Sequence, residues 1–362
     1  MRGGKPLRAL IRILVLIAAV LAVVFYLNLS FGEEILVNEH PDTPQEDKTL
    51  VEETKDETDN PQIEAPTTGL ATLIGKEISL LEERLGKPSR VDESAYGYEW
   101  WIYKKSFQEY IQVGVRNEKV VTLYAIGNDV DITPFKLGQP VEEIYASVPI
   151  GPYISLMYDG SSYRFELTEN DMNTRPLVQM GDFYAQFYID KFDGTLSSVR
   201  FMDAETLIKL QPYELAYVGE LVEVKPWEKG SETEIANGNA EQIFDISNVM
   251  RVRHQLNPLE KDEMVAEVAL AHSIDMYESD DFSHTSKTSG ELSDRLEAGE
   301  VFYQLAGENI AANYADAPAV MEGWLNSKGH RETLLNGEFT HIGVGVYNLH
   351  YTQNFIQKWT EK

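Results

Sequence analysis

The sequence predicts an α+β fold with two domains, a duplicated helix-plus-antiparallel-sheet domain over residues 68–215 and a domain of mixed helices and strands over residues 241–362. A helical spacing that recurs, with similar strands after each copy, predicts the duplication. A third observation is that six of the seven histidines fall in the last third of the chain. The chain has 362 residues, of which 43% are hydrophobic, and this is enough for two cores.

The two predicted copies start with matching helices. Apolar residues at the same offsets from a glycine are Ile78, Leu81 and Leu85 after Gly75, and Val141, Ile144 and Val148 after Gly138. Tyrosine-, tryptophan- and valine-rich runs follow each helix, and both copies close on a hairpin, RNEKVVTL and FDGTLSSV. The aromatic residues favour a strand core over a cleft between the copies. Because no histidine lies between His40 and His254, we interpret this domain as a binding or spacing module.

The first 32 residues are predicted to be a transmembrane anchor or a signal segment. Four cations within the first twelve residues precede an unbroken apolar run from Ile13 to Leu27. The length of this run favours an uncleaved anchor, whereas Ser30-Phe31-Gly32 offers a cleavage signal that would make the protein secreted. In both cases the N-terminal cations place the bulk of the chain outside the cytoplasm, as a single-pass protein of the cell membrane or a released one.

Two segments are predicted to be linkers. Residues 33–67 are interpreted as an acidic disordered linker, because residues 33–64 hold twelve acidic residues, two lysines and few apolar ones. Residues 216–240 are interpreted as a second, shorter connector.

Composition also excludes several kinds of function. The net charge of −28 leaves no basic surface for nucleic acid. The absence of cysteine excludes disulfides, thiolate catalysis and cysteine-based zinc sites, so any metal would take histidine and carboxylate ligands.

The C-terminal domain is predicted to begin with two helices near residues 241–256 and 261–279 and to end with two strands, THIGVGVYN and YTQNFIQKW. His272 lies on the apolar stripe of the second helix, so we expect a hydrogen-bonded core histidine there. The two glycines of GVGV are expected to permit close packing.

The residues of the C-terminal domain resemble the CAP superfamily of cysteine-rich secretory proteins, antigen 5 and pathogenesis-related 1 proteins, in its cysteine-free bacterial form. The resemblance covers about 120 residues and rests on the following positions: Asn248, Arg251, Pro258-Leu259, the AHSIDM run, Phe282-Ser283-His284, Gly307-Glu308-Asn309, Trp324, Ser327, Gly329-His330-Arg331, Ile342 to Val346, Gln353 and Phe355. Residues 68–215 look like the CAP-associated N-terminal domain of bacterial membrane-anchored members.

The resemblance implies a three-layer α-β-α sandwich whose cleft holds two histidines and two glutamates. His284, Glu308 and His330 fall on three of these four positions, and Ser327 replaces the second glutamate. These four residues are the candidate catalytic set. Ser327 stands three residues before His330, but no nucleophile elbow accompanies it.

Two imidazoles and a carboxylate are a suitable donor set for zinc, so His284 and His330 are the candidate metal ligands, with weak binding expected because one glutamate is missing. His341 is a further candidate ligand, with a strand-edge role as the alternative. The same residues are suited to general acid and base work.

Three functions follow from these residues. The first is a binding module of the cell envelope whose cleft takes a lipid, a wall peptide or a partner protein, with the membrane itself contacted through the N-terminal helix. The second is a metal-assisted hydrolase acting on peptides or envelope material. The third is a scaffold or sensor in which residues 68–215 bind and the CAP domain supports them.

Overall fold

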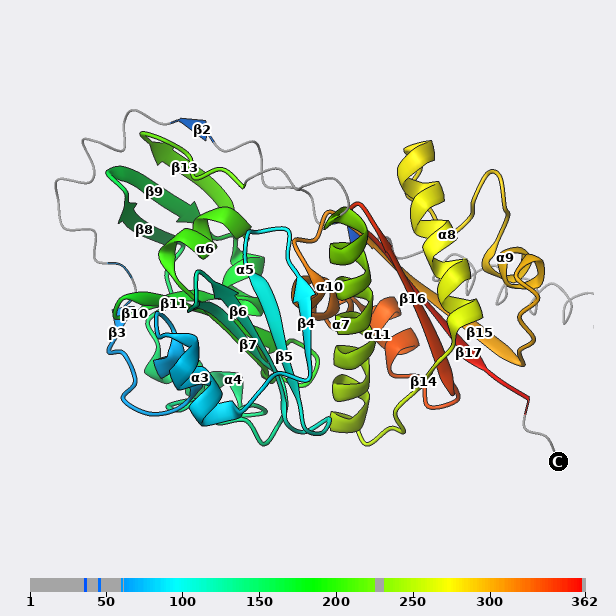
Figure 1. The fold of residues 1–362 in the computed structure, drawn as a ribbon, viewed down its shortest axis with the longest axis horizontal. Coiled ribbons are helices and arrows are strands. Elements are labelled where there is room, and N and C mark those ends of the chain that lie inside the picture. The colour runs from blue at the N-terminus through cyan, green and yellow to red at the C-terminus, as the bar shows by residue number, and fades with distance from the viewer. Residues whose placement is uncertain (1–35, 38–44, 47–59, 61, 225–230, 360–362) are drawn as a thin grey trace, which may run out of the picture. The chain divides into compact units, whose positions relative to one another are not determined.

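The structure is a computed structural model that describes residues 36–37, 45–46, 60, 62–224 and 231–359. The predicted anchor or signal segment, residues 1–32, lies outside these residues. The chain from Leu36 onward forms one compact unit. It contains sheets of eight, five and four strands in the described residues (Figure 1). Of the helices that the structure describes, none has the length and hydrophobicity to cross a bilayer.

The described helices are η1 (Leu70–Leu73, a 3-10 helix), α3 (Ile78–Leu85), α4 (Val141–Ser147), α5 (Glu169–Thr174), α6 (Ala204–Leu210), α7 (Ser231–Arg253), α8 (Glu263–Ser279), α9 (Leu292–Ala298), α10 (Ala317–Leu325) and α11 (Lys328–Leu334). The described strands are β1 (Leu36–Val37), β2 (Gln45–Glu46), β3 (Gln62–Ile63), β4 (Arg90–Glu93), β5 (Glu99–Lys104), β6 (Tyr110–Arg116), β7 (Lys119–Ala125), β8 (Tyr153–Tyr158), β9 (Ser161–Glu166), β10 (Leu177–Met180), β11 (Phe183–Asp190), β12 (Thr195–Met202), β13 (Glu214–Val218), β14 (Glu260–Lys261), β15 (Leu305–Ala312), β16 (His341–Tyr347) and β17 (His350–Gln357).

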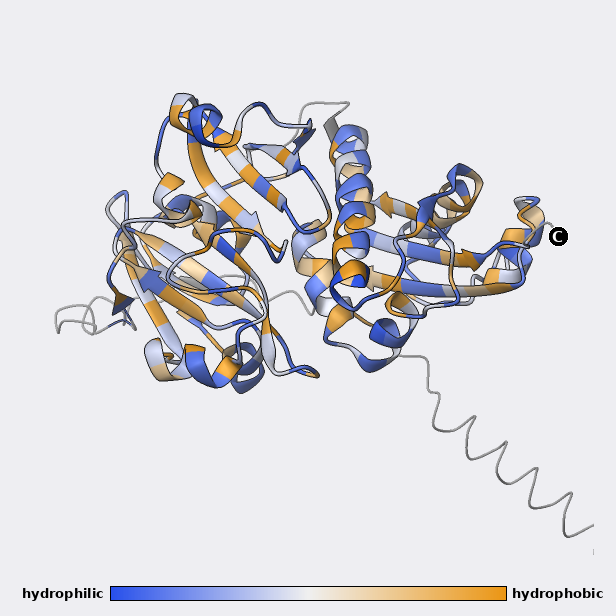
Figure 2. Cartoon of the chain, turned by 90° about the horizontal axis from the view of Figure 1, so that it is seen from below, coloured by the Kyte–Doolittle hydropathy of each residue, from blue (hydrophilic) through white to orange (hydrophobic). Residues whose placement is uncertain are grey.

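The eight-stranded sheet joins both predicted copies. Its order is β3-β10-β11-β12-β7-β6-β5-β4, and the copies meet where β12 pairs antiparallel with β7, with Val199 opposite Ala125. The expected helices α3 and α4 bury Leu81 and Ile144 in one core on this sheet. Strands β8 and β9 belong to the second copy by sequence, but they do not join the eight-stranded sheet. They pair in the four-stranded sheet. Hydrophobic residues recur along the strands of this sheet (Figure 2), and both of its faces are covered, because every residue of β11 is buried.

The C-terminal domain is the expected three-layer sandwich. Its sheet has the order β1-β15-β17-β16-β14. Helices α7, α10 and α11 cover one face, where Tyr351 and Phe355 of β17 enter the larger core. Helices α8 and α9 cover the other face, where Ile356 packs with Val268 and Leu296 (Figure 1). Successive residues of β17 therefore face opposite helix layers.

The glycines of β16 permit the close approach of α8. A Cβ atom on Gly343 would lie 2.1 Å from the backbone nitrogen of Ala266, and one on Gly345 would lie 2.0 Å from that of Leu270. Both distances are far inside van der Waals contact. The expectation that these glycines serve packing is confirmed.

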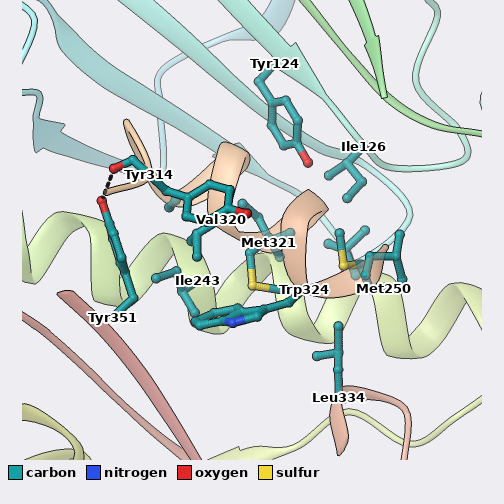
Figure 3. Close-up of a cluster of buried hydrophobic side chains, with 14 of the residues drawn as sticks. Tyr124, Ile126, Ile243, Met250, Tyr314, Val320, Met321, Trp324, Leu334 and Tyr351 are labelled. Carbon is teal, nitrogen blue, oxygen red and sulfur yellow. Dashed lines mark hydrogen bonds between the residues drawn. The ribbon is translucent and has the colours of Figure 1, made fainter. Parts of the chain in front are cut away.

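The core does not stop at the boundary between the two predicted domains. Tyr124 and Ile126 from β7 and its end pack with Met250 of α7 and Met321 of α10 in one cluster (Figure 3). A buried ion pair between Arg200 and Asp316, 2.5 Å apart, crosses the same boundary. The two domains thus share one hydrophobic core.

The described parts of the two predicted linkers pair with other parts of the chain, while the linker bounds stay a prediction. Within residues 33–67, β1 pairs with β15, β2 with β13 and β3 with β10, and the Asn60 side chain accepts a hydrogen bond from the Ser155 backbone at 2.8 Å. Backbone pairing, which the acidic composition does not reveal, orders these points. The expected connector at residues 216–240 overlaps β13, which ends at Val218, and α7, which begins at Ser231.

Candidate functional site

Glu308 is the centre of a buried polar cluster on the α8 side of β15. Its side chain is 4% exposed, and its Oε1 lies 2.9 Å from Nδ1 of His284. Arg295 of α9 donates from Nη2 to Oε2 at 2.5 Å. Both oxygens of Glu308 are therefore already paired. His284 is 21% exposed and is the member of this contact that meets solvent.

The surroundings of Glu308 favour its ionised form. Burial alone raises the pKa of Glu308, but the hydrogen bond with His284 and the charge of Arg295 outweigh it, so that the pKa lies below its ordinary value of 4.5. An ionised carboxylate only accepts hydrogen bonds. It follows that Nδ1 of His284 carries a proton, and when the ring holds only that proton Nε2 is an acceptor or a metal ligand.

His330 and Ser327 approach β15 from its other face. The side chain of Asn309, next to Glu308 in the strand, donates to the His330 carbonyl at 3.1 Å and to Oε1 of Gln353 at 3.2 Å. Adjacent strand residues point to opposite faces, so these contacts lie on the side of α10 and α11. Nδ1 of His330 is 2.5 Å from the Ser327 hydroxyl, and both residues are buried.

The four predicted tetrad positions thus form two pairs in the structure. His284 meets Glu308 directly, and Ser327 meets His330 directly, while Asn309 links the second pair to the residue beside Glu308. Convergence of all of them in one cleft remains a prediction.

His341 lies elsewhere in the sheet. It starts β16, which β17 separates from β15. Its Nδ1 is 2.8 Å from the Thr340 hydroxyl and its Nε2 is 3.5 Å from Glu260. These contacts are those of a strand-edge residue, and a role as a zinc ligand stays a prediction.

Three groups lie around Glu308 whose position there the sequence analysis did not predict. His272 is buried, as expected, but neither ring nitrogen has a hydrogen-bond partner in the part of the chain that the structure describes, and Nε2 is 3.8 Å from Glu308. Burial lowers the pKa of His272 below 6.5, so the ring is neutral. Asn354, opposite Glu308 on β17, is likewise buried with an unsatisfied side-chain amide. Alternation along β17 could have indicated Asn354, whereas nothing in the sequence singled out Arg295.

A different group has the geometry of a metal site. Asp190, Asp193 and His254 bring three donor atoms within 4.8 Å of one another, and within the described ranges no other such group occurs. Arg331 already occupies this group, with Nη1 2.7 Å from Asp190 and Nη2 3.0 Å from Asp193. As placed, His284 and His330 do not form a zinc site together with Glu308, and zinc binding by them stays a prediction.

Two family models match the chain. The model described as CAP-associated N-terminal matches residues 74–213, and the model described as cysteine-rich secretory protein family matches residues 244–359. The uncharacterized membrane protein YlbC of Bacillus subtilis is 50% identical over 298 residues, which are 82% of this chain and 86% of YlbC. The uncharacterized protein YkwD of the same organism is 39% identical over 119 residues, which are 32% of this chain and 46% of YkwD.

Two solved structures are similar to this one over most of their length. An extracellular SCP-domain protein of Bacillus anthracis has 45% identity and a TM-score of 0.78, covering 82% of this chain and 97% of that chain. A cysteine-rich secretory protein of Staphylococcus aureus has 30% identity and a TM-score of 0.73, covering 83% of this chain and 98% of that chain. The chain therefore belongs to the cysteine-rich secretory protein (CAP) family, in the form in which a CAP-associated N-terminal domain precedes the CAP domain.

Proposed function

We propose that this protein is an extracytoplasmic, membrane-anchored binding module whose site around His284, Glu308 and His330 takes an envelope ligand: a lipid, a wall peptide or a partner protein. The contact between Glu308 and His284 is the observation that supports this most directly. A buried, ionised carboxylate fixes the tautomer and orientation of a histidine that reaches solvent. Such an arrangement holds the imidazole of His284 in position for one polar contact with a ligand.

The chemistry of His284 restricts what that group is. With Nδ1 donating to Glu308, the other nitrogen of a singly protonated ring accepts a hydrogen bond. A ligand that donates one, such as a peptide amide or a hydroxyl of a lipid headgroup, fits this position. Arg295 offsets the charge of Glu308 and keeps the carboxylate from attracting a free cation strongly.

Two features argue for binding over catalysis by a serine nucleophile or by a general base. Ser327 and His330 are in contact, but their exposed fractions are 6% and 3%, so a substrate carbonyl cannot reach the hydroxyl without a rearrangement. Glu308 already uses both oxygens for His284 and Arg295, so it is unsuited to act as a general base.

The proposal is tested with the full chain in detergent micelles, immobilised and exposed separately to envelope lipids, soluble wall peptides and solubilised envelope proteins. Mass spectrometry of the retained material identifies the fraction that binds. His284→Ala is expected to reduce retention by about tenfold, the effect of losing a single strong polar contact. His341→Ala is the matched control, since it removes a histidine of similar partial burial that lies on β16, away from Glu308. Equal retention by wild type and His284→Ala would overturn the proposal.

The second candidate function is a metal-assisted hydrolase, and the same Glu308–His284 contact favours it. A carboxylate that accepts from one ring nitrogen commonly orients a histidine whose other nitrogen binds zinc. Zinc, when bound, supplies a Lewis acid and an activated water. Calorimetric titration of wild type and of the double variant His284→Ala plus His330→Ala decides this: absence of zinc uptake by wild type at micromolar concentration removes the candidate.

A further inference from the structure

The outer edge of β16 is open along most of its length. On one side β16 pairs with β17 throughout. On the other side β14 reaches only His341 and Ile342, so in the described residues no strand lies beside Gly343–Tyr347. This edge is separated from Glu308 by the whole of β17.

The register shows which backbone groups point outward. A two-residue turn, Asn348-Leu349, with φ of 44° and 61°, joins β16 to β17, so the flanking pair Tyr347 and His350 is hydrogen bonded. Alternate residues of β16 therefore bond to β17, and the intervening ones face outward, as the 3.0 Å bond from the Asp262 N–H to the Ile342 carbonyl confirms.

The backbone N–H and carbonyl groups of Val344 and Val346 also face outward. Within the described part of the chain, no hydrogen bond occupies their backbone N–H or carbonyl groups. Such unpaired groups on a strand edge are a template for another strand. A peptide that pairs with this edge would form the same bonds that β14 forms at Ile342.

Helices α7 and α8 make the edge into a groove. Two adjoining cavities of about 380 and 340 Å³ lie along it. Ala236, Asn237, Leu270 and Val346 line both. Further small side chains, Ala240 on α7 and Ala266 on α8, leave room above the strand in the first cavity.

The groove is acidic. Glu241, Glu263 and Glu267 line the first cavity and Glu232 lines the second, whereas Lys261 is the only cation among the described residues that line either. Lys261 is already held by Glu241 at 2.5 Å and by Glu263 at 3.1 Å. Two carboxylates, Glu232 and Glu267, remain without an ion pair in the described residues.

Charge also decides between possible occupants. A second copy of this chain, with a net charge of −28, would bring like charges to an acidic groove. A cationic strand would meet opposite charges instead. At the outer end, Tyr347 lines the second cavity and contacts the exposed Tyr277, with ring centroids 5.3 Å apart, which gives a cation an aromatic surface.

We propose that the groove between α7 and α8 binds an extended peptide with positively charged side chains, which adds as a strand to Gly343–Tyr347 of β16. Backbone hydrogen bonds to Val344 and Val346 provide the pairing, and the carboxylates of the groove select basic side chains. The inference is independent of the proposed function at His284, because it uses a different strand edge and different helices.

The test uses the full chain in detergent micelles and a fluorescent peptide of alternating lysine and valine, with binding followed by fluorescence anisotropy at low salt. The same peptide with glutamate in place of lysine is the comparison ligand. Two variants separate the two parts of the proposal. Val344→Pro removes an outward N–H but no bond to β17, and Glu267→Lys reverses a groove charge. Glu83→Lys, an exposed glutamate on α3, is the matched control.

We expect wild type to bind the lysine peptide and not the glutamate peptide. Val344→Pro and Glu267→Lys should each weaken binding by about tenfold or more, with Glu83→Lys within about twofold of wild type. Thermal unfolding tests whether Val344→Pro remains folded, and Glu267→Lys keeps the proposal testable if it does not. Equal binding by Val344→Pro and wild type overturns strand addition, equal binding of the glutamate peptide overturns charge selection, and self-association that Val344→Pro abolishes assigns the edge to a second copy instead.

Discussion

Two buried glutamates of the CAP domain lie in opposite electrostatic surroundings. Glu308, on β15, is paired with Arg295 and His284, and its pKa lies below the ordinary value. Glu322, on α10, accepts from the hydroxyls of Tyr124 at 2.9 Å and Ser198 at 2.5 Å. Burial raises the pKa of Glu322, and these hydroxyls with the nearby Arg253 do not reverse that shift.

The difference separates a site from a structural contact. Ionised Glu308 holds a histidine that reaches solvent, which is useful for recognising a ligand. Glu322 accepts hydrogen bonds from hydroxyls that come from the N-terminal domain, and burial there disfavours its charged form, so this carboxyl joins the two domains through hydroxyl contacts. The same residue type thus orients a solvent-reaching histidine in one region and packs two domains together in the other.

The largest expected effect is on the Glu308 side. Arg295→Ala leaves a buried carboxylate without its cation and should lower the free energy of unfolding by about 3–5 kcal/mol. Urea unfolding at neutral pH measures this. Lys287→Ala, which breaks an exposed ion pair with Asp281, is the control and should cost under about 1 kcal/mol. A loss as small as that of the control would show that Glu308 is not charged.

The same substitution should act differently at the two glutamates. Glu308→Gln removes the charge that compensates Arg295 and should destabilise the fold by about 2–3 kcal/mol near neutral pH. Glu322→Gln replaces a carboxyl whose charged form burial disfavours by a neutral amide of similar shape, and it should change stability by about 1 kcal/mol or less, in either direction. Equal losses in the two variants, measured by urea unfolding, would remove the contrast on which this comparison depends.

The pH dependence of the two variants should also differ in sign. Glu308 has a lowered folded pKa, so its contribution to stability is present above 4.5 and is lost as the pH falls through the folded pKa. Glu322 has a raised folded pKa, so the unfolded chain releases a proton that the folded chain keeps, and wild type loses stability as the pH rises from 4.5 to that pKa. Relative to wild type, Glu322→Gln should gain stability with rising pH and Glu308→Gln should lose it. The Glu308 slope lies below pH 4.5 and the Glu322 slope lies above it, so unfolding free energies are collected on both sides of that value, and slopes of the same sign in the two variants would contradict the assignment.

His272 should give the smallest effect at neutral pH. Because burial lowers its pKa, the folded state disfavours its charged form, and stability is lost as the pH falls below 6.5. His272→Leu should match wild type near neutral pH within about 1 kcal/mol and exceed it at lower pH. Thermal unfolding at two pH values is sufficient. An unchanged pH dependence would mean that His272 gains a charged partner, such as Glu308, 3.8 Å away.

The sequence was sufficient to predict the helices and the family, but it was not sufficient to predict which groups surround Glu308. Periodicity located α3 and α4, and the resemblance indicated His284 and Glu308. Arg295 could not be predicted, because its contact depends on how α9 packs against β15. The shared core was missed as well, since Tyr124 of β7 alternates as an ordinary strand residue and reveals nothing of Glu322.

The predicted linkers show a second feature that the sequence did not reveal. Acidic composition indicates a segment that cannot form its own core. It does not reveal that β1, β2 and β3 pair with strands of sheets that other parts of the chain form. Two-residue strands leave no periodicity in a sequence, so only tertiary structure places them.

The central claim is that an ionised Glu308 fixes His284 as the Nδ1–H tautomer. Nitrogen-15 NMR of the histidine rings at about pH 8, where an imidazole is neutral, measures this directly, with His284→Ala identifying the signal. The account predicts a protonated Nδ1 and an unprotonated Nε2 for His284 in wild type, and a loss of this preference in Glu308→Gln. A protonated Nε2 in wild type, or an unchanged preference in the variant, would contradict it.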